Sequence, residues 1–111
     1  MKAIKLFFAV MMMLAIYLAG CAKAEEPREG FVLEVKGSSV LVVQNITQER
    51  YNDIKGITSN ALIDQGGLDL IWLEHDKARR FDKGDHVTFS TDGGVRESYP
   101  AQADAKKIEH K

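Results

Sequence analysis

The sequence predicts a small, mainly β domain: a five-stranded OB-like barrel with one short helix between the second and third strands. Apolar and polar residues alternate with a period of two in several short segments, as they do in strands with one buried face. Clusters of glycine, aspartate and serine separate these segments, which is typical of tight turns. The chain has a single cysteine, so no internal disulfide can staple the fold, and closing the sheet would protect its edges. An OB-like barrel is one way to close five strands.

The first two strands form a predicted hairpin. Residues 30–35 (GFVLEV) alternate, with Phe31, Leu33 and Val35 on one face. The turn KGSS then leads into a second apolar run, VLVV, at residues 40–43. Because the connection is short, the two strands are expected to pair in an antiparallel manner.

A short helix is predicted over residues 45–56 (NITQERYNDIKG). Asn45 is a suitable N-cap, Gln48 occupies the capping-box position three residues later, and Gly56 suits the end of the helix. Tyr51 would lie on the same flank as the two isoleucines of this segment. The segment is barely three turns long and contains weak helix formers, so a loop with one helical turn is the alternative.

The third strand, residues 68–73 (LDLIWL), follows the turn DQGG and is apolar on both faces except at Asp69. A run of this kind suits a central strand that is covered on both sides, with Trp72 in the core. A polar connector at residues 74–85 leads to a fourth strand at residues 86–91, where apolar and polar side chains alternate.

The fifth strand follows Pro100, which cannot donate a ladder hydrogen bond and therefore belongs at a strand start or edge. Three alanines alternate with polar residues over residues 101–105, and their small side chains suit the narrow inside of a small barrel. The alternation breaks at Lys107. A β-bulge at Lys106 and Lys107 would return Ile108 to the interior.

The N-terminus carries the marks of an export signal. Two lysines precede an apolar run at residues 6–18, and the uncharged span up to residue 22 reaches only about 25 Å against a hydrocarbon core of about 30 Å. The run ends in LAGC, which resembles the lipobox of bacterial lipoproteins, with Cys21 as its cysteine. The resemblance implies that the Cys21 thiol receives a diacylglyceryl group, that a peptidase cuts before it, and that acyl chains anchor the product. An uncleaved N-terminal anchor is the alternative.

The predicted organisation is therefore a lipoprotein signal peptide at residues 1–20, a tether at residues 21–29 and the barrel at residues 30–111. Without the two lysines of the signal, 13 of the 15 basic residues remain against 16 acidic ones, a net charge of −3. A nucleic-acid-binding surface needs a surplus of positive charge, so nucleic acid is not an expected partner.

The C-terminal third of the chain resembles a known family. FDKGDHV at residues 81–87 and DGGVRESYPAQADAKKIE at residues 92–109 are similar to the YobA-like family of small exported proteins and lipoproteins from Bacillus-type bacteria. The most specific element is SYPAQA, residues 98–103, and the likeness covers residues 30–109. The resemblance implies an OB-like fold and an extracytoplasmic location. It transfers no catalytic residue, because the family is classed as a domain of unknown function.

The titratable residues form no recognisable catalytic or metal-binding motif. His75, His86 and His110 have no metal-ligand spacing, and Asp82 and Asp85 flank a plain turn rather than a calcium loop. The sequence also contains no nucleophile elbow and no phosphate-binding glycine loop. We therefore expect a protein that is not an enzyme and that needs no cofactor and no metal.

Two groups of residues are candidates for ligand binding. A basic cluster at residues 77–83 includes Arg79 and Arg80, which could contact anionic lipid headgroups or cell-wall polyanions. A solvated loop is the alternative interpretation of this cluster. Tyr51 and Tyr99 are candidates for a partly exposed aromatic platform, since OB-like barrels bind ligands on one open face. The alternative for the segment around Tyr99 is a purely structural role in closing the barrel.

The sequence therefore favours a lipid-anchored, non-enzymatic binding or interaction module on the extracytoplasmic face of a Gram-positive cell membrane. Its expected partners are membrane lipid, through acylated Cys21, and an exported protein or a cell-wall component. Two alternatives stay open. One is a structural or envelope-stress protein without a small ligand, against which a deep apolar cleft would count. The other is a wall-acting enzyme or enzyme inhibitor, which requires a pocket with coupled titratable groups.

Overall fold

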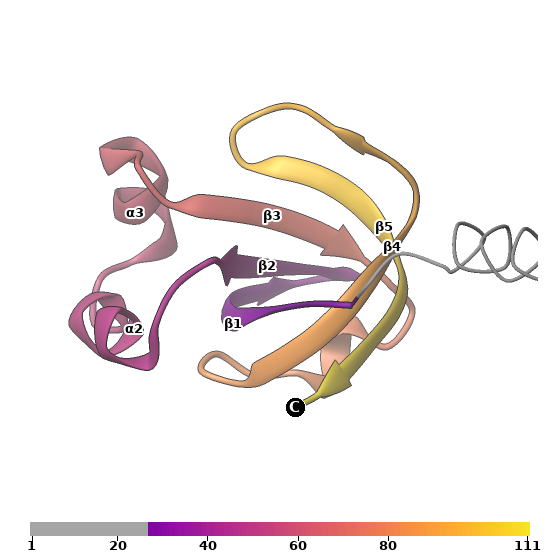
Figure 1. Cartoon of the computed structure of the whole chain (residues 1–111), viewed down its shortest axis with the longest axis horizontal. Coiled ribbons are helices and arrows are strands. Elements are labelled where there is room, and N and C mark those ends of the chain that lie inside the picture. The colour runs from indigo at the N-terminus through magenta and orange to yellow at the C-terminus, as the bar shows by residue number, and fades with distance from the viewer. Residues whose placement is uncertain (1–26) are drawn as a thin grey trace, which may run out of the picture.

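The computed structural model describes residues 27–111. They form a closed β-barrel with the strand order β1-β2-β3-β5-β4 (Figure 1). β3 and β5 run parallel, and the other neighbouring strands are antiparallel. In chain order the elements are β1 (Arg28–Lys36), β2 (Ser39–Gln44), α2 (Gln48–Ile54), α3 (Ser59–Gln65), β3 (Asp69–Glu74), the 3-10 helix η1 (Ala78–Arg80), β4 (His86–Arg96) and β5 (Ala101–His110).

This architecture confirms the predicted five-stranded OB-like barrel. The barrel begins at Arg28, two residues earlier than expected, because Arg28 and Glu29 already pair with β4. The expected signal peptide, Cys21 and most of the expected tether lie outside the described residues. Within residues 27–111, no helix is both long enough and apolar enough to cross a membrane.

The expected face of β1 is wrong at Val35 because β1 contains a bulge. Val32 pairs with Val42, and the next paired residue of β1 is Glu34, so Leu33 is an extra residue. A bulge changes the phase of the alternation. Phe31 and Leu33 therefore pack on the outside of the barrel, whereas Val35 packs against the inner core together with Val32.

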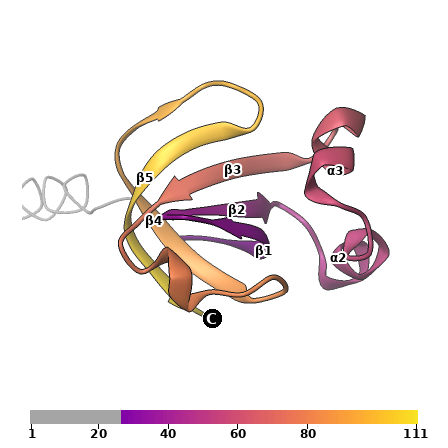
Figure 2. The ribbon, with the colours of Figure 1, turned by 180° about the vertical axis from the view of Figure 1, so that it is seen from behind.

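Both faces of the sheet formed by β1, β2 and β3 are buried, which confirms the prediction for the third strand. The outer cluster lies between the outer face of these strands and the helices α2 and α3. The inner cluster fills the barrel and consists of Val32, Val40, Val42, Ile71, Leu73, Ala78, Phe81, Val87, Phe89, Ala103, Ala105 and Ile108. Figures 1 and 2 show both helices at the end of the barrel where β2 finishes and β3 begins. Trp72 is half-buried against the outer cluster. The outer cluster consists of Phe31, Leu33, Leu41, Val43, Tyr51, Ile54, Leu62 and Leu70.

Two short helices stand where one was predicted. α2 is capped by Thr47, whose side-chain oxygen accepts a hydrogen bond from the Arg50 N–H, and not by Asn45. Asn45 has a φ of 53° and therefore lies in a left-handed turn. α3 was not predicted. Its seven residues are too few to form a stable helix alone, and it is held by its Thr58 cap and by burial of Leu62.

A hydrogen bond also ties α3 to the barrel. The Ser59 hydroxyl in the first turn of α3 donates to the Glu34 carboxylate at 2.8 Å. Glu34 follows the bulge of β1 and pairs with Leu41, whose side chain belongs to the outer cluster. The bulge therefore turns an acidic side chain toward the N-terminus of α3, where negative charge is favourable.

The loop before β4 continues the pairing of β1. β4 pairs with β1 up to Phe31, and the next residue, Val32, donates its N–H to the Asp85 carbonyl at 2.9 Å. The Gly84 N–H in turn donates to the Val32 carbonyl at 2.8 Å. Asp82 and Asp85 close the turn itself, since the Asp82 N–H donates to Asp85 Oδ2 at 2.8 Å. These bonds occupy the edge of β1 beyond the point where β4 leaves it.

The predicted bulge in the fifth strand is confirmed. Ser90 pairs with Lys107 and Thr91 pairs with Ala105, which leaves Lys106 as the extra residue of β5. Ile108 is consequently buried in the inner cluster with the alanines of the same strand. Pro100 stands immediately before β5, at the strand start, and the bond that precedes it is a cis peptide.

Candidate functional site

A polar groove lies at the end of the barrel where β2 leads into α2. Its main cavity has a volume of about 820 Å³. A second cavity of about 450 Å³ shares Gln44 to Thr47 and Asp69 with it and extends toward Arg50 on α2. Volumes of this size are typical of small-molecule sites. The groove is defined here by the residues that line the main cavity: Pro27, Arg28, Glu29, Gly30, Phe31, Gln44, Asn45, Ile46, Thr47, Gln48, Asp69 and His86.

A fixed carboxylate lies in the groove, where both cavities meet. Asp69 begins β3 and pairs with Gln44, the last residue of β2. Gln44 Nε2 donates to Asp69 Oδ1 at 3.2 Å, and Asn45 Nδ2 donates to Asp69 Oδ2 at 2.5 Å. Gln44 is only 7% exposed. Both carboxylate oxygens are therefore held by amides from the neighbouring strand end, which fixes the orientation of the Asp69 side chain.

Three stacked rings lie beside the groove, and two of them, Phe31 and His86, line its main cavity. The Phe31 ring lies between those of Tyr51 and His86, with centroids 4.4 Å apart on each side and interplanar angles of 9° and 16°. Tyr51 is only 6% exposed, so the expectation of a partly exposed platform is wrong for this residue. Its ring is buried because α2 packs against the outer face of β1. Burial raises the pKa of Tyr51, and the Asp85 carboxylate raises it further.

Ion pairs lie at one side of the groove, where β1 and β4 meet the C-terminal residues of the chain. Glu29 accepts a hydrogen bond from the Lys111 ammonium, and His86 Nε2 lies 3.8 Å from Glu29 Oε2. The hydrogen bond and the charge of Lys111 lower the pKa of Glu29, and His86 lowers it further. Nearby, His110 Nε2 lies 2.9 Å from Asp85 Oδ2. The titratable side chains at this rim are thus engaged with one another.

Removing the lysine at this rim should raise the pKa of Glu29. In Lys111→Met the carboxylate loses both its hydrogen bond and the nearest positive charge, so its pKa should return toward the ordinary value of 4.5. A depressed pKa stabilises the folded state above the unfolded pKa, and this contribution is lost as the pH falls through the folded pKa. NMR titration of the Glu29 side-chain carbons measures the change. Lys107→Met is the control, since Lys107 pairs with Glu109. An unchanged Glu29 pKa in Lys111→Met would contradict the assignment.

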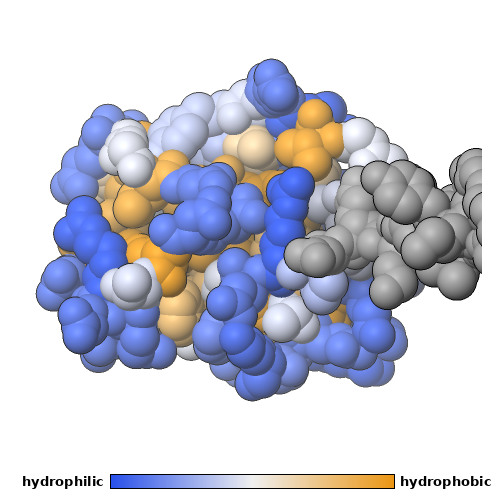
Figure 3. Space-filling view, viewed as in Figure 1, coloured by the Kyte–Doolittle hydropathy of each residue, from blue (hydrophilic) through white to orange (hydrophobic). Residues whose placement is uncertain are grey.

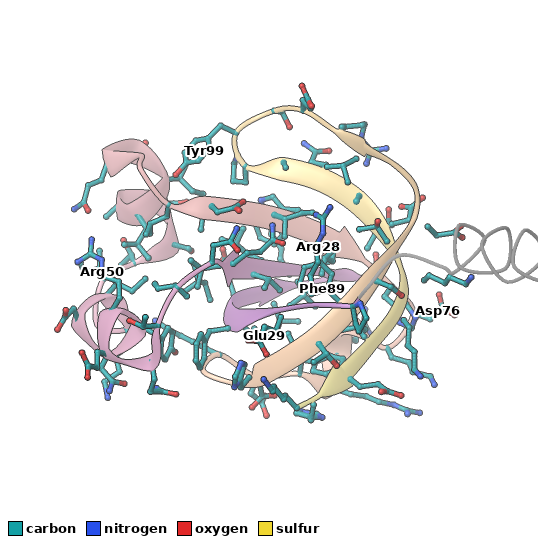
Figure 4. All side chains as sticks on the ribbon, in the orientation of Figure 1. Arg28, Glu29, Arg50, Asp76, Phe89 and Tyr99 are labelled. Atoms are coloured by element: carbon teal, nitrogen blue, oxygen red, sulfur yellow. The ribbon has the colours of Figure 1, made fainter. Side chains whose placement is uncertain are left out.

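The other expected binding residues do not come together. Arg79 and Arg80 are exposed on η1, and the connector that carries them also contains the acidic residues Glu74, Asp76, Asp82 and Asp85. The four positive charges of the cluster are therefore balanced within the same segment; they belong to Lys77, Arg79, Arg80 and Lys83. Tyr99 is 48% exposed and stands beside the start of β3, whereas Asp76 lies at the opposite end of that strand (Figure 4). Neither Tyr99 nor either of the two arginines lines the main or the second cavity.

The sequence reasoning missed the centre of the groove. Asp69 was visible as the one polar residue in an otherwise apolar strand, and this was its only signal. In the sequence, Gln44 and Asn45 look like an ordinary strand end. Their contact with Asp69 depends on the register between β2 and β3, which the sequence does not show. Within residues 27–111, no group of three or more His, Cys, Asp or Glu side chains is placed to hold a metal ion.

The fold and the groove define the class of protein: a small OB-like β-barrel with a polar groove at one end. A family model described as "Protein of unknown function (DUF3221)" matches residues 29–109. This match covers well over half of the chain, and the protein belongs to that family. No match was found among curated proteins or among solved structures.

Proposed function

We propose that this chain is a lipid-anchored, extracytoplasmic binding module of the YobA-like lipoprotein type, and that its groove holds a polar ligand of the cell envelope. The observation that carries the proposal is the Asp69 carboxylate, held from both sides by Gln44 and Asn45 at the centre of the groove. A polar group that is fixed by its neighbours before a ligand arrives loses little entropy on binding. Such preorganisation is what a binding site requires.

The rim of the groove favours binding over catalysis. A general base is expected to face a substrate or a nucleophile, with a pKa shifted toward neutrality. Here the pKa of Glu29 is lowered, because the carboxylate is held by Lys111 and His86. His110 Nε2 lies 2.9 Å from Asp85 Oδ2, and the His110 ring is tilted by 32° against the Phe81 ring, with ring centroids 4.7 Å apart. These side chains stabilise one another, and the groove beside them supplies hydrogen-bonding groups.

The proposed anchor rests on the sequence LAGC that ends at Cys21. From Cys21 to Arg28 the chain has seven steps, which span at most about 25 Å even when fully extended. A lipid on Cys21 would therefore keep the barrel within about its own diameter of the membrane surface. The ligand of such a domain has to be available in that layer, which supports a component of the membrane, of the wall or of another exported protein.

The anchor is tested by intact mass and membrane fractionation of the wild type and Cys21→Ala in a Gram-positive host. We expect the wild type to begin at Cys21, to carry a diacylglyceryl group and to fractionate with membranes. Cys21→Ala should carry no lipid. A full-length and unmodified wild-type chain would overturn the lipoprotein assignment.

The binding role is tested by photo-cross-linking on intact cells. A photoreactive residue at Gln48, which lines the groove, should give a defined product, and the same residue at Asp76 should not. Both positions are exposed, and Asp76 lies at the opposite end of β3 (Figure 4). Absence of a product from Gln48, or identical products from the two positions, would argue against the groove as a binding site.

A further inference from the structure

We infer that the groove binds a neutral oligosaccharide. Its hydroxyl groups hydrogen-bond to Asp69, Gln44 and Asn45, and one sugar ring lies against Tyr99. The inference rests on the proposed function, since it specifies the ligand of the same groove. Five features carry it: the balance of donors and acceptors, the balance of charge, the exposed aromatic ring near the start of β3, the extended shape of the groove, and the paired edges of β1 and β2.

The centre of the groove offers donors and acceptors side by side. An ionised carboxylate can accept about four hydrogen bonds, and Gln44 and Asn45 supply two of those to Asp69. Each of the two amides also has an oxygen that can accept and a second N–H that can donate. A hydroxyl group donates and accepts at once, so a row of sugar hydroxyls matches this arrangement better than a ligand with donors or acceptors alone.

The charges along the groove favour a neutral ligand. Arg28 and Glu29 line the main cavity from β1, Arg50 lines the second cavity, and Asp69 lines both. Taken together, the two cavities are lined by two arginines and two carboxylates. A polyanion such as a nucleic acid requires a surplus of positive charge, and a polycation requires the reverse. The groove offers neither.

An exposed aromatic ring stands near the start of β3, the strand that carries the fixed carboxylate. Tyr99 lies two residues before β5, which begins at Ala101 opposite Ile71 of β3, and it is outside the residues that line the two cavities. Figure 4 shows Tyr99 beside the start of β3, and the ring is 48% exposed. One face of a sugar ring presents C–H groups, which pack favourably on the negative face of an aromatic ring. A sugar chain that extends from the groove past the start of β3 would meet this ring.

The shape of the site also suits a chain of sugars. The second cavity continues the main one along the β2–α2 connection, which makes the groove longer than a single compact pocket. On the face shown in Figure 3, hydrophilic side chains stand beside apolar surface. Sugars have the same mixed character, because polar rims alternate with apolar ring faces.

A peptide is the less favoured ligand. An extended peptide binds well where a strand edge offers unpaired N–H and C=O groups. At this end of the barrel β1 is paired with both β2 and β4, and β2 is paired with both β1 and β3. The edges of β1 and β2 are thus occupied, whereas the exposed side chains of Asp69 and Asn45 remain accessible from the groove.

The test is calorimetric titration, in detergent, of the lipidated protein that begins at Cys21, with two probes, chitotetraose and cellotetraose. We expect saturable binding of at least one probe. Asp69→Asn should weaken it at least tenfold, since two acceptor positions become donors. Tyr99→Ala should weaken it at least tenfold as well, and Tyr99→Phe should stay within twofold because the ring face is kept. Asp76→Asn is the matched control and should leave the affinity unchanged.

Each result decides the inference. Binding of chitotetraose alone identifies an amino-sugar chain as the ligand class, and equal binding of both probes identifies the hexose ring itself. No saturable binding of either probe by the wild type, or binding that Asp69→Asn and Tyr99→Ala both leave unchanged, overturns the inference. Tyr99 is exposed, so Tyr99→Ala keeps the test valid even if a variant at Asp69 is unstable.

The experiments distinguish failure of the inference that the ligand is a sugar from failure of the proposed binding role. A protein cross-linked through Gln48 on cells, together with no binding of either probe, overturns the sugar and keeps the groove as a binding site. No cross-link and no probe binding overturn both.

Discussion

Replacing Gly30 with alanine is expected to destabilise the barrel by about 3 kcal/mol or more, which removes much of the stability of a small domain. Gly30 is buried in β1 opposite Gln44. A Cβ at this position would overlap the carbonyl oxygen of Val43 and lie 2.5 Å from Val42 Cγ1. The oxygen belongs to the backbone of a central strand and cannot move aside without breaking the pairing of β1 with β2.

Urea denaturation of the full chain, followed by the fluorescence of Trp72, measures this effect. Trp72 is the only tryptophan of the chain and is half-buried in the outer cluster. Gly56→Ala is the matched control, because a Cβ on Gly56 meets no atom within 4 Å. That variant should change the free energy of unfolding by less than about 1 kcal/mol. Equal stability of Gly30→Ala and the wild type would show that β1 and β2 are further apart than described here.

Leu62→Ala should destabilise the domain by about 3 kcal/mol, even though Leu62 lies outside the barrel. The side chain is 1% exposed and fills the outer cluster from α3. Its removal leaves a cavity between α3 and the strands that the closed barrel cannot collapse to fill. The same urea titration measures the loss, and an unchanged m-value would show that α3 unfolds together with the barrel.

Ile63→Ala tests the specificity of this effect. Ile63 is the next residue on α3 and is only half-buried at the edge of the outer cluster. Its replacement should cost about 1 kcal/mol, since less apolar surface is lost. If Leu62→Ala and the wild type unfold at the same urea concentration, the two helices are an independent cap and the outer cluster adds nothing to the barrel.

The strands could be predicted because their signals are local. The bulge at Lys106 was readable, since the alternation of small and polar residues visibly breaks there and a buried Ile108 restores it. The bulge at Leu33 causes no visible break in the alternation of apolar and polar residues. Residues 31–33 are all apolar, so either face could be the inner one until the pairing with β2 decided between them. α3 was missed because packing, and not helix propensity, stabilises a helix of seven residues.

The groove was less accessible to prediction than the fold. Tyr51 and Tyr99 look equivalent as isolated tyrosines, but α2 buries Tyr51 in a stack with Phe31 and leaves Tyr99 exposed. Exposure of this kind depends on tertiary packing. The contact of Asp69 with Gln44 and Asn45 joins residues 24 and 25 positions apart through the strand register. Local sequence patterns do not predict that register.

The hydrogen bonds between Val32 and the loop before β4 affect how two copies of this domain can interact at high concentration. A strand with free N–H and C=O groups adheres to any similar strand, and sheet proteins that lack protection at such edges tend to aggregate. β1 is exposed to this risk where β4 leaves it, and there Gly84 and Asp85 occupy the backbone groups of Val32. The bulge at Leu33 follows at once and bends the strand away. Two copies of the domain that meet at this point of β1 therefore find an interrupted edge and not a continuous one.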